Sequence, residues 1–212
     1  MNNKEEHLET LSEIRTLMER SSKFLSLSGI SGISAGIIAI VGVVAASIYQ
    51  GYSFFEKARV SKLLDSTCGL NTDFVLFFLI DAIAVIILVL CASAFFTIRK
   101  AKKRKLPIWD NSAKRLVWNL MIPLASGGAF CLILVYYGAV FLITPSMLIF
   151  YGLSLINASK FTHDEIGVLG AGEIMLGIVA AFFIGYGLLF WAIGFGLFHI
   201  VYGTYMYFKY ER

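Results

Sequence analysis

The sequence carries little charge for its length. Charged residues make up 15% of the 212 residues, hydrophobic residues make up 58%, and the mean hydropathy is +0.77. Soluble domains are about one quarter charged. A soluble core cannot hide so much apolar surface, so the composition indicates an integral membrane protein.

Several chemical signatures are also absent. The sequence has no HExxH, GxSxG or P-loop motif, so it offers no support for metalloprotease, serine hydrolase or nucleotide-binding chemistry. The three cysteines form no disulfide framework. The three histidines lie at different depths, and we expect neither a metal site nor a cofactor.

We expect no nucleic-acid partner either, because the basic run Arg99–Lys105 has no recognisable nucleic-acid domain around it and is typical of a topology determinant that contacts anionic lipid.

Long uncharged stretches determine the predicted fold. Residues 24–55 and 116–159 contain no charged residue, while 74–98 and 166–208 contain one each, Asp81 and Glu173. About 20 apolar residues cross a bilayer, so each of the two longest stretches in the second half must form two spans. We predict an all-α polytopic transmembrane bundle of six spans in one domain, 24–212. The spans lie near 24–49, 74–98, 116–139, 145–160, 163–184 and 188–208.

Local signals mark where the later spans begin. Thr144 and Pro145 have the residue types of a helix N-cap and first helical position. Thr162 and Glu165 have capping-box spacing, which predicts a helix start near 163. Glycines 185 and 187 separate the last two spans.

The basic residues predict the orientation. If both termini are cytoplasmic, every Lys and Arg except Lys57, Arg59 and Lys62 lies on the cytoplasmic side, as the positive-inside rule requires. Residues 1–23 precede the first span and carry a helical stripe of Leu8, Leu11, Ile14 and Met18. We predict a short N-terminal amphipathic cytoplasmic helix that lies on its neighbours. The alternative is a docking helix for a protein partner through residues 5–20.

Two stretches resemble a known group of proteins. Residues 17–29 (LMERSSKFLSLSG) and 195–203 (FGLFHIVYG) are similar to those of uncharacterised six-span bacterial inner-membrane proteins. The resemblance implies a multi-pass protein of the bacterial inner membrane. It implies no activity.

Three ionisable residues lie inside the predicted spans. Such a group costs roughly 2.5–3.5 kcal/mol at the bilayer centre, so it usually faces the bundle interior or a cavity. Glu173 and His199 are both about 15 Å from the basic side by residue counting, so we expect them to meet. Asp81 lies near the opposite side and cannot reach them. The pair is either a hydrogen-bonded contact that orients the last hairpin or a proton-handling or ligand site.

A second polar group is expected at the basic side. Pro123 leaves the carbonyl of Asn119 without its helical donor, and Asn157 lies near the same depth. We expect a kink at Pro123 and a polar contact to the free carbonyl. These polar residues either form hydrogen bonds between helices or line a cavity that is open to the cytoplasm.

Small residues predict close helix packing. Gly32 and Gly36 form a GxxxG face on the first span, which packs inside the molecule or, alternatively, forms a homodimer. Gly177 on the fifth span and Gly196 and Gly203 on the sixth predict that these two helices clasp one another.

Three functions remain open from the sequence. The first is a non-enzymatic interaction, scaffold or regulatory component in contact with membrane lipids. The second is a small proton-linked transporter that uses Glu173 and His199. A hydrated cavity that joins the polar groups would be evidence for it. The third is an intramembrane enzyme that acts on a lipid.

Overall fold

The computed structural model describes residues 23–24, 27–51, 53–58, 71–105 and 109–212. All regular structure in these ranges is helical, and six helices are long and apolar enough to cross a membrane, which confirms the predicted number of spans. Apart from Lys23, the predicted N-terminal helix lies outside the described residues.

Each of the first five spans contains one α-helix, and the last is divided. They are α2 (Gly29–Gln50), α4 (Thr72–Arg104), α5 (Asn111–Tyr136), α6 (Ile143–Ser159) and α7 (Glu165–Phe182). The last span consists of α8 (Gly187–Trp191), the π-helical segment η2 (Ala192–Phe198) and α9 (His199–Tyr210). A 3₁₀ turn, η1 (Val140–Leu142), precedes α6.

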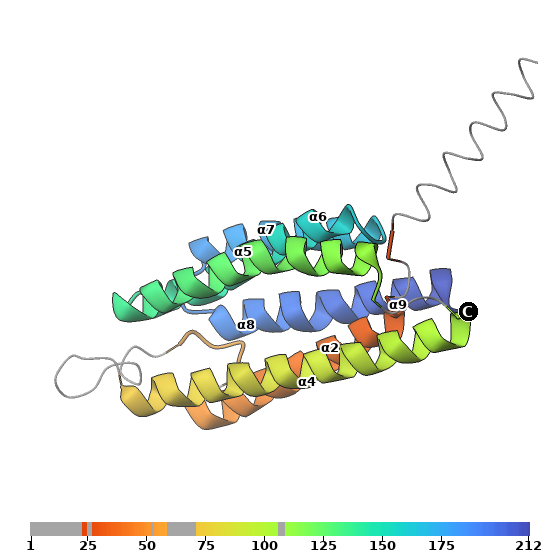
Figure 1. The fold of residues 1–212 in the computed structure, drawn as a ribbon. Helices are drawn as coiled ribbons and strands as arrows, with labels where there is room; N and C mark the ends of the chain where they lie inside the picture. Colours follow the sequence, from red (N-terminus) through yellow and green to blue (C-terminus); the bar gives the residue numbers. More distant parts are fainter. Residues whose placement is uncertain (1–22, 25–26, 52, 59–70, 106–108) are drawn as a thin grey trace, which may run out of the picture.

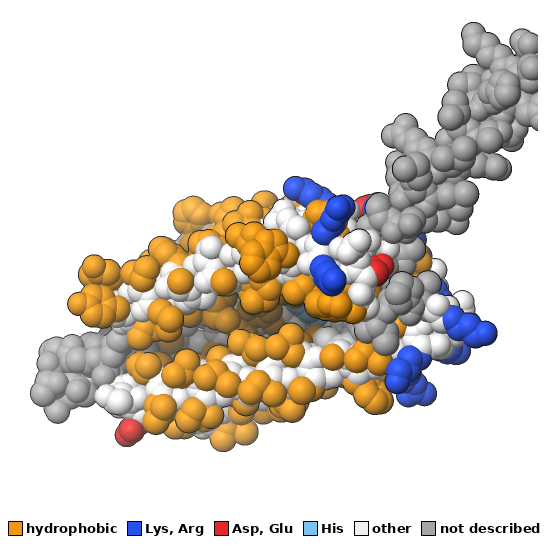
Figure 2. Space-filling model, in the orientation of Figure 1, with side chains coloured by type: hydrophobic (Ala, Val, Ile, Leu, Met, Phe, Trp, Pro, Cys, Tyr) orange, Lys and Arg blue, Asp and Glu red, His pale blue; other side chains and the backbone are white. Residues whose placement is uncertain are grey.

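The helices form two groups with the last span between them. On one side α5 packs on α6 and α6 packs on α7, and on the other α2 packs on α4. The last span lies between the groups, as Figure 1 shows, and α9 packs mainly on α2. Lys and Arg side chains gather at the end where α4 ends and α5 begins, while apolar side chains cover the flanks (Figure 2). We call these the basic end and the opposite end.

Glycines bring α2 and the last span into backbone contact. A Cβ atom on Gly36 would lie 2.5 Å from the carbonyl oxygen of Gly196, and one on Gly29 would lie 2.5 Å from that of Gly203. Gly32 is equally constrained, because its Cβ would lie 3.0 Å from the Cα of Gly203. The GxxxG face is therefore occupied inside the molecule.

Glycines also join α6 to α7. A Cβ on Gly170 would lie 2.6 Å from the carbonyl oxygen of Gly152, and one on Gly177 would lie 2.9 Å from that of Pro145. The clasp predicted between the last two spans is therefore wrong, since α7 packs on α6 and α9 packs on α2. A short turn fixes the order of two helices along the chain, but it leaves each helix free to pack more closely on another neighbour.

The caps predicted for two helices are also wrong, although the helices begin within two residues of the predicted positions. The fourth span begins with η1, and the N-cap of α6 is Leu142, so Pro145 lies in the first turn, where its missing N–H still leaves no helical bond unmade. No side chain caps α7. Thr162 instead donates a hydrogen bond of 2.7 Å to the carbonyl of Phe24.

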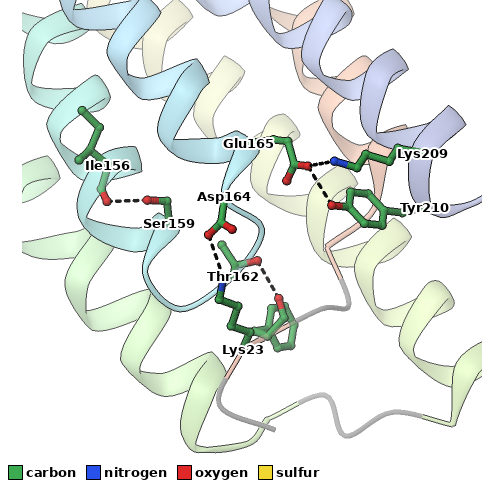
Figure 3. A network of polar contacts seen from close by, with 9 residues as sticks. Lys23, Ile156, Ser159, Thr162, Asp164, Glu165, Lys209 and Tyr210 are labelled. Atoms are coloured by element: carbon green, nitrogen blue, oxygen red, sulfur yellow. Dashed lines mark hydrogen bonds and ion pairs between the residues drawn. The ribbon is translucent and has the colours of Figure 1, made fainter. Parts of the chain in front are cut away.

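The segment before α2 is tied to the α6–α7 loop at the basic end. Phe24 N–H donates to the carbonyl of Phe161 at 2.7 Å, next to the Thr162 bond. Lys23 Nζ lies 2.8 Å from the carboxylate of Asp164 (Figure 3). These contacts fix the point where the chain enters the first span.

The start of α7 is joined to the end of α9 by Glu165. Its carboxylate pairs with Lys209 and accepts a hydrogen bond of 2.8 Å from the Tyr210 hydroxyl (Figure 3). The last span is thereby held at the basic end against the group that contains α7.

Glu211 joins α9 to α2 and α4. Its carboxylate accepts the Gly29 N–H at 2.6 Å, which gives one of the unpaired donors at the start of α2 a partner. Lys100, near the end of α4, lies 3.1 Å from the same carboxylate oxygen. The two helix groups are thus connected at the basic end by contacts that involve α2, α4, α7 and α9.

Candidate functional site

The carboxyl group of Glu173 lies in an apolar enclosure between the helix groups. The side chain is fully buried on α7, and neither carboxyl oxygen has a hydrogen-bond partner in the part of the chain that the structure describes. Gly194 faces it from the last span: a Cβ at that position would lie 2.5 Å from the Oε2 atom of Glu173 and 2.5 Å from Leu148. Only a glycine at 194 leaves room for the carboxyl group.

His199 is a polar neighbour of Glu173. Its Nδ1 lies 3.6 Å from the Oε1 atom of Glu173, which is close enough for an ionic contact but beyond a hydrogen bond. Nδ1 lies 3.0 Å from the carbonyl oxygen of Gly194, and Nε2 lies 2.7 Å from the hydroxyl of Tyr151. A carbonyl oxygen only accepts, so Nδ1 carries a hydrogen. In the neutral ring Nε2 then accepts the hydroxyl hydrogen of Tyr151, and both nitrogens are satisfied without Glu173.

The π-helical segment supports this arrangement. It spans Ala192–Phe198, directly before His199. Short π segments within helices occur frequently at functional sites. The ring of His199 folds back to the carbonyl of Gly194, five residues earlier, while the absent side chain of Gly194 makes room for Glu173.

The structure thus brings together Glu173 and His199, which the sequence placed at one depth, and adds Tyr151 and Gly194, which the sequence analysis missed. Tyr151 lies within an uncharged stretch, where its hydroxyl needs a partner, and this was the one available signal. No sequence signal distinguishes Gly194 from the chain's other glycines. We call Glu173, His199, Tyr151 and Gly194 the Glu173 site.

Asn119 and Asn157 form a separate polar contact. The Asn157 amide donates to the carbonyl of Asn119 at 2.9 Å, and the Asn119 amide donates to the carbonyl of Arg115 at 2.8 Å. Asn157 supplies the polar contact expected for the carbonyl that Pro123 leaves free. Helix α5 continues through Pro123, and a kink there stays a prediction.

A groove of about 430 Å³ opens between the helix groups toward the opposite end. Helices α2 and α4 form one wall, α5, η1 and α6 form the other, and α8 contributes Leu188 and Trp191. Figure 2 shows the surface hollowed between its two apolar sides. Asp81 of α4 lines this groove, whereas Glu173 and His199 do not, so the structure does not bring Asp81 to the Glu173 site.

Aromatic rings lie between the groove and the Glu173 site. Trp191 lines the groove and its ring centroid lies 5.1 Å from that of Phe195. The Phe195 ring is in turn 5.2 Å from Tyr151 and 6.2 Å from His199. These rings separate the two sites, so the hydrated cavity expected for a transporter is not formed by this groove.

The described residues hold no group of three or more His, Cys, Asp or Glu side chains that could bind a metal ion. Glu173 and His199 provide two such groups, one short of that number.

The chain matches no model of a known protein family, no curated protein and no solved structure in the comparisons made. The function proposed for it therefore depends on the geometry of the two sites.

Proposed function

We propose that the chain is a small proton-linked membrane carrier in which Glu173 binds and releases the proton. The observation that carries the proposal is the complete burial of a carboxyl group that has no hydrogen-bond partner among the described residues. Burying such a group without a partner is unfavourable, and ionisable groups inside a membrane often mark ion or proton pathways. A purely structural carboxyl would be expected to make the hydrogen bonds that offset its burial.

The neighbouring groups suit the exchange of one proton. With the proton on Glu173 the site is uncharged, and the N–H of His199 remains bonded to Gly194. Transfer of that proton toward the bulk leaves a carboxylate 3.6 Å from Nδ1 of the imidazole. The net charge of an apolar site then changes by one, which favours a different arrangement of the helix groups around it. A proton-linked carrier requires this dependence of conformation on proton occupancy. The rearranged state would also have to open the hydrated path to Glu173 that the groove does not form here.

The other two hypotheses draw less support from the described residues. The small-residue faces that suggested an interaction component or a homodimer are used for packing inside the molecule. The predicted docking segment, 5–20, lies outside the described residues. An enzyme acting on lipid needs a nucleophile within reach of its substrate, but the Tyr151 hydroxyl is bonded to His199 behind the aromatic rings.

We further propose the bacterial inner membrane as the location, with both termini in the cytoplasm. The gathering of basic side chains at one end of the molecule supports this orientation. Contact with membrane lipids is expected along the apolar flanks of α4 and α5.

Infrared spectroscopy of the full chain in lipid nanodiscs tests the proton site. We expect an absorption band from a protonated carboxyl group that disappears reversibly as the pH rises and is missing in Glu173→Gln. The matched control is Asp73→Asn, which makes the same chemical change at an exposed position in the first turn of α4. If the Glu173 carboxyl stays in one state across the accessible pH range, it does not exchange protons and the proposal is wrong.

A further inference from the structure

The groove has the position of a site that opens to the bilayer. Helices α4 and α5 form its two edges, and they do not pack on each other along their lengths. The last span lies behind the space between them (Figures 1 and 2). Since the outer faces of α4 and α5 are apolar and exposed, the mouth lies among lipid chains. Its volume of about 430 Å³ is within the range of small-molecule sites.

The described lining of the groove carries acidic side chains. It includes two carboxylate residues, Asp81 and Glu56, and among the described lining residues there is no Lys, Arg or His. Within the part of the chain that the structure describes, Asp81 has no hydrogen bond or ion pair. It lies against Gly42, whose Cβ would be 3.5 Å from its carboxylate. A carboxyl group in this position is neutralised either by taking up a proton or by pairing with a cation that enters the groove.

The rest of the lining suits an apolar cation. Four aromatic side chains line the groove: Phe74, Phe78, Phe141 and Trp191. Aromatic faces attract cations, and organic ammonium groups are commonly recognised by several such rings. A small inorganic cation would lose its hydration in this apolar lining, whereas an organic cation with an apolar body would bury that body.

We propose that the groove binds an organic cation with an apolar body, which enters from the bilayer between α4 and α5 and pairs with Asp81. The cation is either a free lipophilic molecule or the head of a cationic lipid. This would supply the substrate class of the carrier proposed above. The binding site does not depend on that proposal, because no residue of the Glu173 site lines the groove.

Two ions of matched shape and opposite charge test the inference. Tetraphenylphosphonium and tetraphenylborate are nearly identical in size, so only charge distinguishes their binding. Equilibrium dialysis of the purified full chain in detergent, with a protein-free micelle blank, gives both affinities. We expect the wild type to bind the phosphonium at least about tenfold more tightly than the borate, as for a partly buried charge pair. A single-chain cationic amphiphile added as competitor distinguishes the sources, since it should displace the phosphonium if the groove accepts cationic lipids.

Variants assign the binding to Asp81. Asp81→Asn should weaken phosphonium binding about tenfold and leave borate binding unchanged or stronger, while Asp81→Glu should retain most of the affinity. Asp73→Asn, on the same helix but outside the groove, should bind like the wild type. If Asp81→Asn does not fold, the difference between the affinities of the wild type for the two ions still tests the inference. Equal binding of both ions, no binding of the phosphonium, or full affinity in Asp81→Asn overturns the inference and leaves a groove for neutral lipid chains.

Discussion

Replacing Glu173 by methionine should make the protein more stable. Methionine is unbranched and of similar size, so it fits the same enclosure. Among the described residues the two carboxyl oxygens of Glu173 have no hydrogen-bond partner, and Nδ1 of His199 lies 3.6 Å from one of them. His199 keeps both of its own partners in the variant, because these are Gly194 and Tyr151. The substitution therefore removes an unpaired buried group and leaves none behind.

The expected change in the free energy of unfolding follows from the energetic cost of burying a polar group without a partner. Leaving a buried donor or acceptor unsatisfied costs about 1–3 kcal/mol, and replacing buried charged groups by apolar ones of similar volume is often neutral or stabilising. We expect Glu173→Met to raise the free energy of unfolding by about 1–3 kcal/mol. The loss of the contact with His199 places the value toward the lower end of this range.

Unfolding in mixed detergent micelles, followed by circular dichroism, measures this difference. Asn157→Leu is the control, because Asn157 does have a partner, the Asn119 carbonyl. That variant should lose about 0.5–2 kcal/mol, the scale of interhelical hydrogen bonds in membranes. A Glu173→Met protein less stable than the wild type would show that the carboxyl group stabilises the fold. The main physical argument for a proton site would then fail.

Three further experiments probe other features, the first two by the same unfolding assay. Gly194→Ala should cost about 1–3 kcal/mol by overpacking against the Glu173 site, whereas Gly128→Ala, with nothing within 4 Å, should be neutral or slightly stabilising; equal effects would contradict the close approach at 194. Glu211→Ala should cost about 1–3 kcal/mol by leaving the Gly29 N–H unpaired, and an unchanged stability would show that water replaces the carboxylate. For the orientation, Cys68, which lies outside the described residues, should react with a membrane-impermeant thiol reagent in intact cells; reaction only after lysis would reverse the topology.

The number of spans could be predicted from the sequence because the bilayer imposes a length. An uncharged stretch of more than twice the spanning length must turn back, whatever its packing. The common depth of Glu173 and His199 followed from the constant rise of a helix along its axis. These are one-dimensional quantities, and residue counting determines them well.

The packing partners of each helix could not be predicted in this way. Counting gives the height of Gly177 on α7, but not whether it faces α6 or α9, since many helix faces here carry small residues. Tyr151 comes from α6, and its contact with His199 depends on the rotation of both helices. Thr162 had the spacing of a helix cap, but the tertiary bond to Phe24 uses its hydroxyl instead.

The aromatic rings between the two sites also provide an optical reporter. Trp191 lines the groove on one side and contacts Phe195, next to His199, on the other. Indole emission responds to nearby charge and polarity, so both an arriving cation and a change at His199 should alter it. The other two tryptophans, Trp109 and Trp118, are 63% and 70% exposed and can be replaced by phenylalanine. A chain with Trp191 as its single tryptophan would then report events on both sides of the rings without any added label.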